Sequence, residues 1–217
     1  RALALGIGGD AGAARLEALV DALVYERVIV PIDVEPDPRV TGVHAGESGH
    51  NPIDFVRAQT PAGEALAIYS SAEVLSAHRP GARPMALDFR TIGLTALVET
   101  GGRVVVNPGT DAVLLPRPAV ASLAQGDAWL PAWRDEDLRD LLLAESSAAC
   151  PAIADVAIVY AGDGLTRVLV SVDRARFAQG EGASSMTAAL SAALNAVGVN
   201  PRLIASADRV EIAPVLR

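Results

Sequence analysis

The sequence predicts an α+β protein: an N-terminal domain with a mixed or antiparallel sheet and helices, followed by a second, smaller α+β domain. Two observations indicate this fold class. The first half of the chain contains two strand–turn–strand patterns with Pro and Gly at their turns, separated by segments of helical periodicity. A third such pattern follows residues 125–131, where Pro and Gly interrupt the helical pattern. We therefore expect domains at residues 1–130 and 131–217.

The N-terminal domain begins with a Gly-rich lead-in and a helix. Leu and Val recur at three- and four-residue spacing over residues 13–25, which is typical of one face of an amphipathic helix. The β-branched run at 28–32 predicts a buried strand. Residues 35–51 are rich in Pro and Gly, and we expect a long, mobile, metal-free loop there. A hairpin is expected over 53–69, with Pro and Gly bending the chain at its centre.

Further elements complete this domain. Ser70 or Ser71 can cap a short helix that ends before Pro80, and a short strand follows around Met85. Asp88 can cap the next helix, which Gly101 and Gly102 stop and which carries apolar residues at positions 92, 94, 96, 97 and 98. A second hairpin is expected at 104–115, around the turn Asn107-Pro108-Gly109-Thr110, and then a helix at 118–124.

The smaller domain has the order helix, strand, strand, helix, strand. The sequence predicts a helix over 135–146, a hairpin over 153–172 around Gly162-Asp163-Gly164, a helix over 184–197 and a closing strand over 209–215.

The charged residues exclude several functions. The chain has 26 acidic and 18 basic residues and a net charge of -8, so we expect neither nucleic acid nor an acidic membrane as partner. Every basic residue is Arg. The absence of Lys excludes the P-loop and kinase lysines, a pyridoxal phosphate Schiff base and a Ser-Lys dyad.

Cysteine content and hydropathy indicate the cellular location. Cys150 is the only cysteine, so no intrachain disulfide can form, and no apolar run approaches the roughly 20 residues of a membrane helix. We expect a cytoplasmic protein.

A Gly-rich stretch at residues 6–11 (GIGGDA) matches the G-x-G-x-x-A pattern of dinucleotide-binding folds, and Asp33 ends the next predicted strand as a ribose ligand would. Such a site needs a parallel sheet built from strand–helix–strand crossovers, whereas hairpins follow here. We therefore interpret the stretch as a flexible lead-in to a capped helix and expect no cofactor.

The segment 44–50 (HAGESGH) places His44, His50 and Glu47 in one loop, where a metal could find three ligands. The segment also differs at one position from the G-x-S-x-G motif of the nucleophile elbow, because His50 stands where the motif has its second glycine. The loop lacks a nearby Cys and a strand-to-helix turn, so we expect neither a metal site nor a catalytic residue.

Five residues are candidates for contact with a partner. Trp129 and Trp133 bracket Pro131 at the domain boundary, as interface anchors or, in the interpretation we favour, as buried side chains that hold the two domains together. The turn with Asn107 and Gly109 could bind a ligand through its amides, although a simple hairpin turn explains it as well. Arg117 follows this hairpin.

Four segments resemble the N-terminal domain of SseB-like proteins from actinobacteria. Residues 59–71 (QTPAGEALAIYSS) are similar to the family's T-x-P-D-G-R-x-A-L-P-V-F-T-S hairpin, and 81–85 (GARPM) to A-R-P-V-P. Residues 104–108 (VVVNP) are similar to L-V-L-D-P, and 117–126 (RPAVASLAQG) to R-P-A-x-x-x-L-A-Q-G. The chain departs from the pattern at three positions: His78 for Trp, Ala67 for Pro and Asn107 for Asp.

The resemblance implies an α+β N-terminal domain, often followed by a smaller one, with no established activity, cofactor or catalytic residue. We therefore expect a non-catalytic interaction or regulatory module that binds an unidentified protein partner. The alternative is a small-molecule-binding protein or hydrolase that uses the Gly-rich N-terminal segment or the His44–His50 loop.

Overall fold

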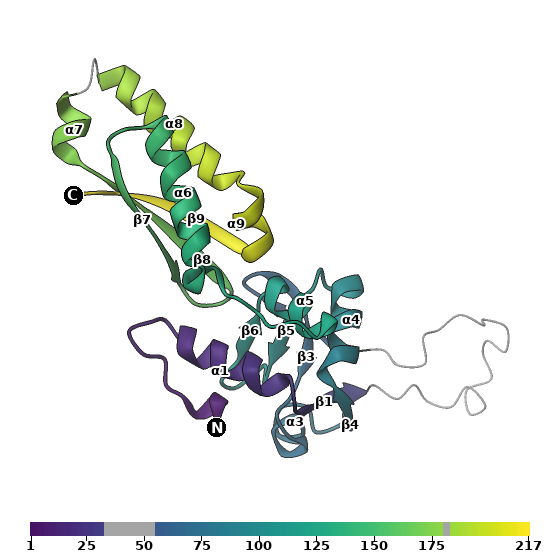
Figure 1. The fold of residues 1–217 in the computed structure, drawn as a ribbon. Coiled ribbons are helices and arrows are strands. Elements are labelled where there is room, and N and C mark those ends of the chain that lie inside the picture. Colours follow the sequence, from purple (N-terminus) through teal and green to yellow (C-terminus); the bar gives the residue numbers. More distant parts are fainter. Residues whose placement is uncertain (33–54, 180–182) are drawn as a thin grey trace, which may run out of the picture. The chain divides into compact units, whose positions relative to one another are not determined.

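The computed structural model describes residues 1–32, 55–179 and 183–217 (Figure 1). Contacts divide the chain into two compact units. Unit 1 contains residues 1–19, 116–119 and 128–217, and unit 2 contains residues 20–115 and 120–127. Both units combine helices with a sheet, which confirms the α+β fold class. The expected boundary at residues 130 and 131 stays a prediction, and the segments 35–51 and 44–50 lie outside the described residues.

The main sheet of unit 2 is mixed and has the order β2-β3-β5-β6. Its strands are β2 (Arg57–Thr60), β3 (Gly63–Ile68), β5 (Val104–Val106) and β6 (Val113–Leu115). The β2–β3 and β5–β6 pairs are antiparallel, which confirms both expected hairpins. Between them β3 and β5 run parallel, so the carboxyl ends of these two strands lie side by side.

A second, two-stranded sheet in unit 2 pairs β1 (Arg27–Ile32) with β4 (Arg83–Asp88) in antiparallel register. Ile29 and Tyr69 exchange two backbone hydrogen bonds of 2.9 and 2.7 Å. Because Tyr69 directly follows β3, this exchange connects the two sheets through the end of a central strand.

Three helices belong wholly or mainly to unit 2: α3 (Ala72–His78), α4 (Phe89–Glu99) and α5 (Arg117–Gln125). The Ser71 hydroxyl accepts a hydrogen bond from the Val74 amide and caps α3 as expected. Asp88 is the N-cap residue of α4, but its carboxylate makes no capping hydrogen bond and lies 3.9 Å from Arg27. A β-carbon at Gly93 would lie 3.0 Å from the Ala124 side chain, so glycine permits α4 and α5 to pack closely.

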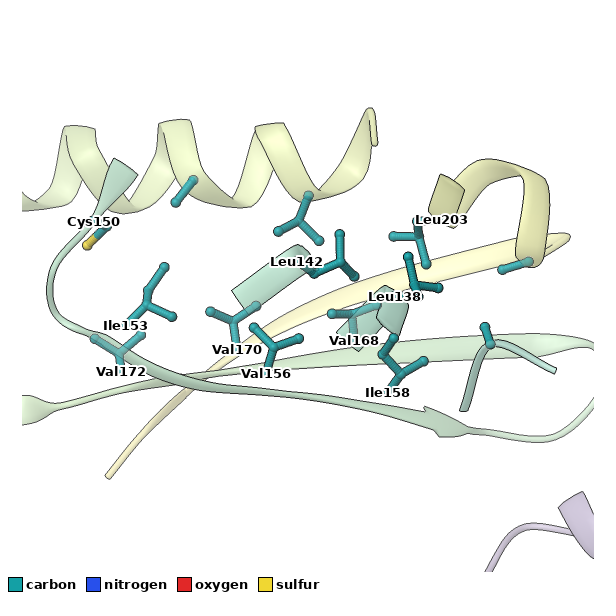
Figure 2. Close-up of a cluster of buried hydrophobic side chains, with 14 of the residues drawn as sticks. Leu138, Leu142, Cys150, Ile153, Val156, Ile158, Val168, Val170, Val172 and Leu203 are labelled. Atoms are coloured by element: carbon teal, nitrogen blue, oxygen red, sulfur yellow. The ribbon is translucent and has the colours of Figure 1, made fainter. Parts of the chain in front are cut away.

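The three-stranded sheet of unit 1 has the order β7-β8-β9. Strands β7 (Ile153–Tyr160) and β8 (Leu165–Val172) form the expected hairpin, and β9 (Arg209–Leu216) runs parallel to β8. Helices α6 (Glu136–Ala149) and α8 (Ala183–Gly198) lie on one face (Figure 1). Figure 2 shows Leu138 and Leu142 of α6 above Val156, Val168 and Val170 of the sheet. The apolar side chains that alternate along β7 and β8 thus form the core.

Short elements complete unit 1: η1 (Ala2–Ala4), η2 (Ala132–Arg134), α7 (Arg174–Gln179) and α9 (Pro201–Ser206). Asp135 caps α6 through the Leu138 amide and accepts two hydrogen bonds from Arg202, at 2.8 and 3.0 Å. Asn200 caps α9 and donates to Glu145 at 2.8 Å. Sequence periodicity did not indicate α7 and α9, because each has only six residues.

The Gly-rich lead-in precedes α1 (Ala13–Leu23) and follows η1, a 3-10 helix, where a dinucleotide-binding fold requires a strand. The Asp10 carboxylate accepts hydrogen bonds from the Gly12 and Ala14 amides at 3.0 and 2.9 Å. These bonds hold the pKa of Asp10 below its usual value. Its own side chain therefore occupies amides that a phosphate would need.

Candidate functional site

Polar side chains meet where the parallel strands β3 and β5 end. The Asn107 side chain accepts a hydrogen bond from the Ser70 amide at 2.8 Å and donates one to the Ser70 hydroxyl at 3.0 Å. Asn107 is buried and has a φ of 53°, a left-handed conformation that Asn tolerates better than most residues. The carboxyl ends of parallel strands are a common place for ligands, so this cluster is the first candidate site.

The aromatic ring of His78 completes this cluster. Its Nδ1 lies 2.8 Å from the hydroxyl of Tyr69, a fully buried side chain. Its other edge lies against Gly109, where a β-carbon would overlap Nε2. Gly109 has a φ of 89°, so the turn needs glycine both for its backbone and for the ring beside it.

The cluster has little capacity for chemistry. Burial raises the pKa of the Tyr69 phenol, which keeps it neutral, and its hydroxyl is bonded to His78. Asn107 and Ser70 form hydrogen bonds with each other. Among the described residues no group of three His, Cys, Asp or Glu could hold a metal ion. The arrangement therefore holds two strand ends and α3 together.

The two tryptophans lie in an aromatic stack within unit 1. The rings of Trp129 and Trp133 are 5.6 Å apart in an edge-to-face arrangement, and Trp133 lies 4.9 Å from Tyr160. Trp133 also donates its indole N–H to Glu17 at 2.6 Å, and Arg134 binds the same carboxylate. Their expected place between two domains stays a prediction.

Arg117 opens α5 and donates to the carbonyl oxygen of Ile204 at 3.2 Å. Arg117 is exposed, as is Gly109, whereas Asn107 is buried. The expected contact of these residues with a partner stays a prediction.

Sequence reasoning missed an exposed apolar surface on α4. Phe89, Ile92, Gly93 and Ala96 face the interior, while Leu94 and Val98, one turn apart on the opposite side, are 51% and 86% exposed. Leu97 is at the edge of this face. The helix is thus apolar on both sides, and packing within unit 2 does not explain the apolar residues of the outer face.

Two further exposed apolar residues lie at the end where α4 begins. Val24 and the 89% exposed Tyr25 precede β1, whose first residue, Arg27, pairs with Asp88 directly before α4. We call Leu94, Leu97, Val98, Val24 and Tyr25 the α4 surface. Within the described part of unit 2 these five are all of the exposed large hydrophobic residues.

The sequence contained a signal for this surface. Positions 92, 94, 96, 97 and 98 place apolar side chains almost all round the helix. A helix with that pattern is either enclosed in a core or meets another surface. One face of α4 stays exposed, so unit 2 does not enclose the helix in its core.

The chain is an α+β protein. Its polar side chains at the ends of β3 and β5 are bonded to one another, and α4 in its N-terminal part exposes one apolar face. The chain belongs to the SseB family: the family model described as SseB protein N-terminal domain matches residues 1–122. No curated protein and no solved structure matches the chain. Among the described residues no helix is long and apolar enough to cross a membrane.

Proposed function

We propose that this SseB-family chain is a non-catalytic interaction module that binds a protein partner through the α4 surface. The observation that carries the proposal is the concentration of exposed apolar side chains on one helix face and the segment beside its start. Scattered exposed hydrophobics are ordinary on protein surfaces, whereas Leu94, Leu97 and Val98 share one helix face, and such a group of apolar side chains marks a site of contact. In unit 1, by contrast, such residues are spread over the N-terminal segment, β7, α9, β9 and the connecting loops.

Contact with a protein is energetically more favourable than contact with water for the side chains of this surface. Burial of apolar area gains about 25 cal/mol per Å², so complete burial of a side chain such as Val98 gains on the order of 1.5 kcal/mol. Arg90 and Thr91 are exposed at the start of the same helix and supply a polar rim. An apolar centre with a polar edge is the usual anatomy of a protein interface.

The alternative, a small-molecule-binding protein or hydrolase, has less support. Asp10 occupies amides of the Gly-rich segment, and the buried Tyr69 engages His78. His44 and His50 lie outside the described residues. Turnover of a substrate that disappears when His44, His50 or His78 is replaced would favour this alternative over the interaction module.

The proposal also covers the type of SseB-like chain and its cellular location. The four sequence segments support an actinobacterial type of SseB-like chain in which a smaller C-terminal domain follows the matched one. The lone, buried Cys150 supports a cytoplasmic location, where thiols stay reduced. Fractionation of the native host with an antibody against the chain tests this location.

The test of the module is a quantitative pull-down from the native host. The bait is the full chain, as wild type, as the double variant Leu94→Asp/Val98→Asp and as the control Val199→Asp/Ile204→Asp, which places the same two charges at 71% and 48% exposed positions of unit 1. We expect a protein recovered with wild type and control and reduced at least tenfold with the double variant. Equal recovery with all three baits would refute the role of the α4 surface.

A further inference from the structure

We propose that the outer edge of strand β9 binds an extended segment of a protein partner, which adds a fourth strand to the sheet of unit 1. The site lies in unit 1, so the inference goes beyond the α4 surface of unit 2 and does not depend on it. Among the described residues β9 pairs only with β8, and it is the last strand in the order β7-β8-β9. Such an edge presents main-chain N–H and C=O groups that a further strand can bind.

The hydrogen bonds at the end of β9 establish which of its main-chain groups point outward. The Arg217 amide donates to the Val172 carbonyl oxygen, and the Arg174 amide donates to the Arg217 carbonyl oxygen, both at 2.9 Å. Residue 217 therefore points its main-chain groups toward β8. Because these groups alternate in direction along a strand, every second residue of β9 points them away from β8. The outward residues are Val210, Ile212, Pro214 and Leu216.

The outward groups of β9 are accessible. Val210 and Leu216 are 38% and 56% exposed, and among the described residues no hydrogen bond engages the outward amides of Val210 and Ile212. Pro214 occupies an outward position, where the pairing with β8 needs no N–H. The opposite edge of the sheet differs. Strand β7 lies beside η2, and the Asp155 carboxylate accepts a hydrogen bond from the outward amide of Val156 at 2.9 Å.

The side chains of β9 define the chemistry of the segment. On the sheet face that lies away from α6 and α8, Arg167 binds Glu211 at 2.8 Å, and the Glu211 side chain retains 47% exposure. A basic residue of an added strand beside Glu211 continues this row of alternating charges, and an acidic residue beside Arg209 does the same two positions away. Apolar residues beside Val210 and Ile212 extend the opposite face. We therefore expect a segment with a basic and an acidic residue two positions apart and apolar residues between and around them.

A second copy of this chain fits the edge poorly. In a two-fold antiparallel pair of β9 strands, the register centred on residue 211 places Glu211 opposite Glu211 of the other copy, and like charges directly opposite are unfavourable. Registers centred on residues 212, 213 or 214 bring Pro214 to a paired position, where it has no N–H to donate. No other register that pairs outward positions overlaps five or more residues of the two strands. The occupant is therefore a segment of different sequence.

Hydrogen exchange measured by NMR on the full chain tests the proposal with a synthetic peptide. The probe is the end-capped peptide Thr-Val-Thr-Val-Arg-Val-Glu, whose Arg lies beside Glu211 and whose Glu lies beside Arg209 in the antiparallel register. Its control carries N-methyl groups on the three valines, whose amides would bind β9. We expect the amides of Val210 and Ile212 to exchange at least tenfold more slowly with the probe and at the original rate with the control. Absence of binding at millimolar peptide, or equal protection by the control, would overturn the proposal.

Two variants at one position test the edge from the side of the protein. Val210→Pro removes an outward N–H and leaves the pairing with β8 intact, whereas Val210→Thr keeps both the N–H and the branched shape. Fluorescence anisotropy of the labelled probe should show at least fivefold weaker binding to Val210→Pro and unchanged binding to Val210→Thr, with thermal melting as the check of folding. Equal binding to both folded variants would contradict the edge as the site. Protection of the Val210 and Ile212 amides that rises with protein concentration in the absence of peptide would identify a second copy as the occupant and overturn the choice of partner.

Discussion

At the scale of single residues, Asn107 holds the ends of β3 and β5 together. Asn107→Ala removes both hydrogen bonds to Ser70, leaves a backbone amide without its partner and places alanine at a φ of 53°. We expect a loss of about 2–3 kcal/mol in the free energy of unfolding, measured with urea. Asn107→Asp keeps the acceptor for the Ser70 amide and should lose less than about 1 kcal/mol. Equal losses for both variants would contradict this role.

Gly109 and His78 should depend on each other. In Gly109→Ala the new methyl group displaces the His78 ring and separates it from Tyr69, in addition to strain at a φ of 89°. We expect a loss of about 2 kcal/mol in the free energy of unfolding. In the His78→Ala background the same change should cost about half as much, because no ring remains to be displaced. Additive losses in this double-mutant cycle would show that the two residues do not interact.

Two tyrosines set an alkaline limit to stability. Burial raises the pKa of Tyr69 and of Tyr160 above the ordinary 10.0. The pKa of each tyrosine is higher in the folded chain than in the unfolded chain. The contribution of the two neutral phenols to the free energy of unfolding is therefore complete below pH 10, and it is lost as the pH rises through the folded pKa. In a Tyr25→Phe variant we expect phenolate absorbance to appear together with loss of helical circular dichroism. Full ionisation of a chain that remains folded would contradict the burial.

At the scale of the element, the two faces of α4 differ in what they stabilise. Ile92 is fully buried, and Ile92→Ala should cost about 2–4 kcal/mol in the free energy of unfolding. Val98→Ala, on the outer face, should change it by less than about 0.5 kcal/mol. Urea denaturation of the two variants measures the difference. A large loss with Val98→Ala would show that the outer face packs against the chain itself.

The sequence predicts elements whose determinants are local. Both N-terminal hairpins are confirmed because Pro and Gly at their turns, such as Pro61 and Gly109, act over a few residues. The parallel pairing of β3 with β5 joins strands separated by α3, β4 and α4, and no local pattern encodes such a partner. The cluster at these strand ends was therefore only half predicted: the turn residue Asn107 was named, but its partner Ser70 was expected only as a helix cap.

The exposed face of α4 was not predicted for a related reason. Apolar periodicity identifies which residues belong to one helix face, but it does not report whether anything covers that face. Leu94 and Val98 are as apolar as the buried Ile92, and only the tertiary structure separates them. Burial is a property of the whole unit, so it becomes visible only when the sheets and α5 are in place.

At the scale of the whole molecule, the polar cluster serves packing, while the α4 surface carries the proposed contact. The matched region, residues 1–122, contains both the cluster at Asn107 and helix α4. In the proposed interaction role, neither the cluster nor the surface would use a cofactor or a catalytic base. The net charge of -8 makes a protein a more favourable partner for the proposed contact than nucleic acid.

Site-specific photo-crosslinking in the native host tests the central claim, contact through the α4 surface, most directly. A benzophenone amino acid is placed at Leu94, and in a matched chain at the exposed Val199 of unit 1. We predict a discrete crosslinked protein product from position 94, either a dimer of this chain or a complex with another protein, and no such product from position 199. No product from position 94, or the same product from both positions, would contradict contact through the α4 surface.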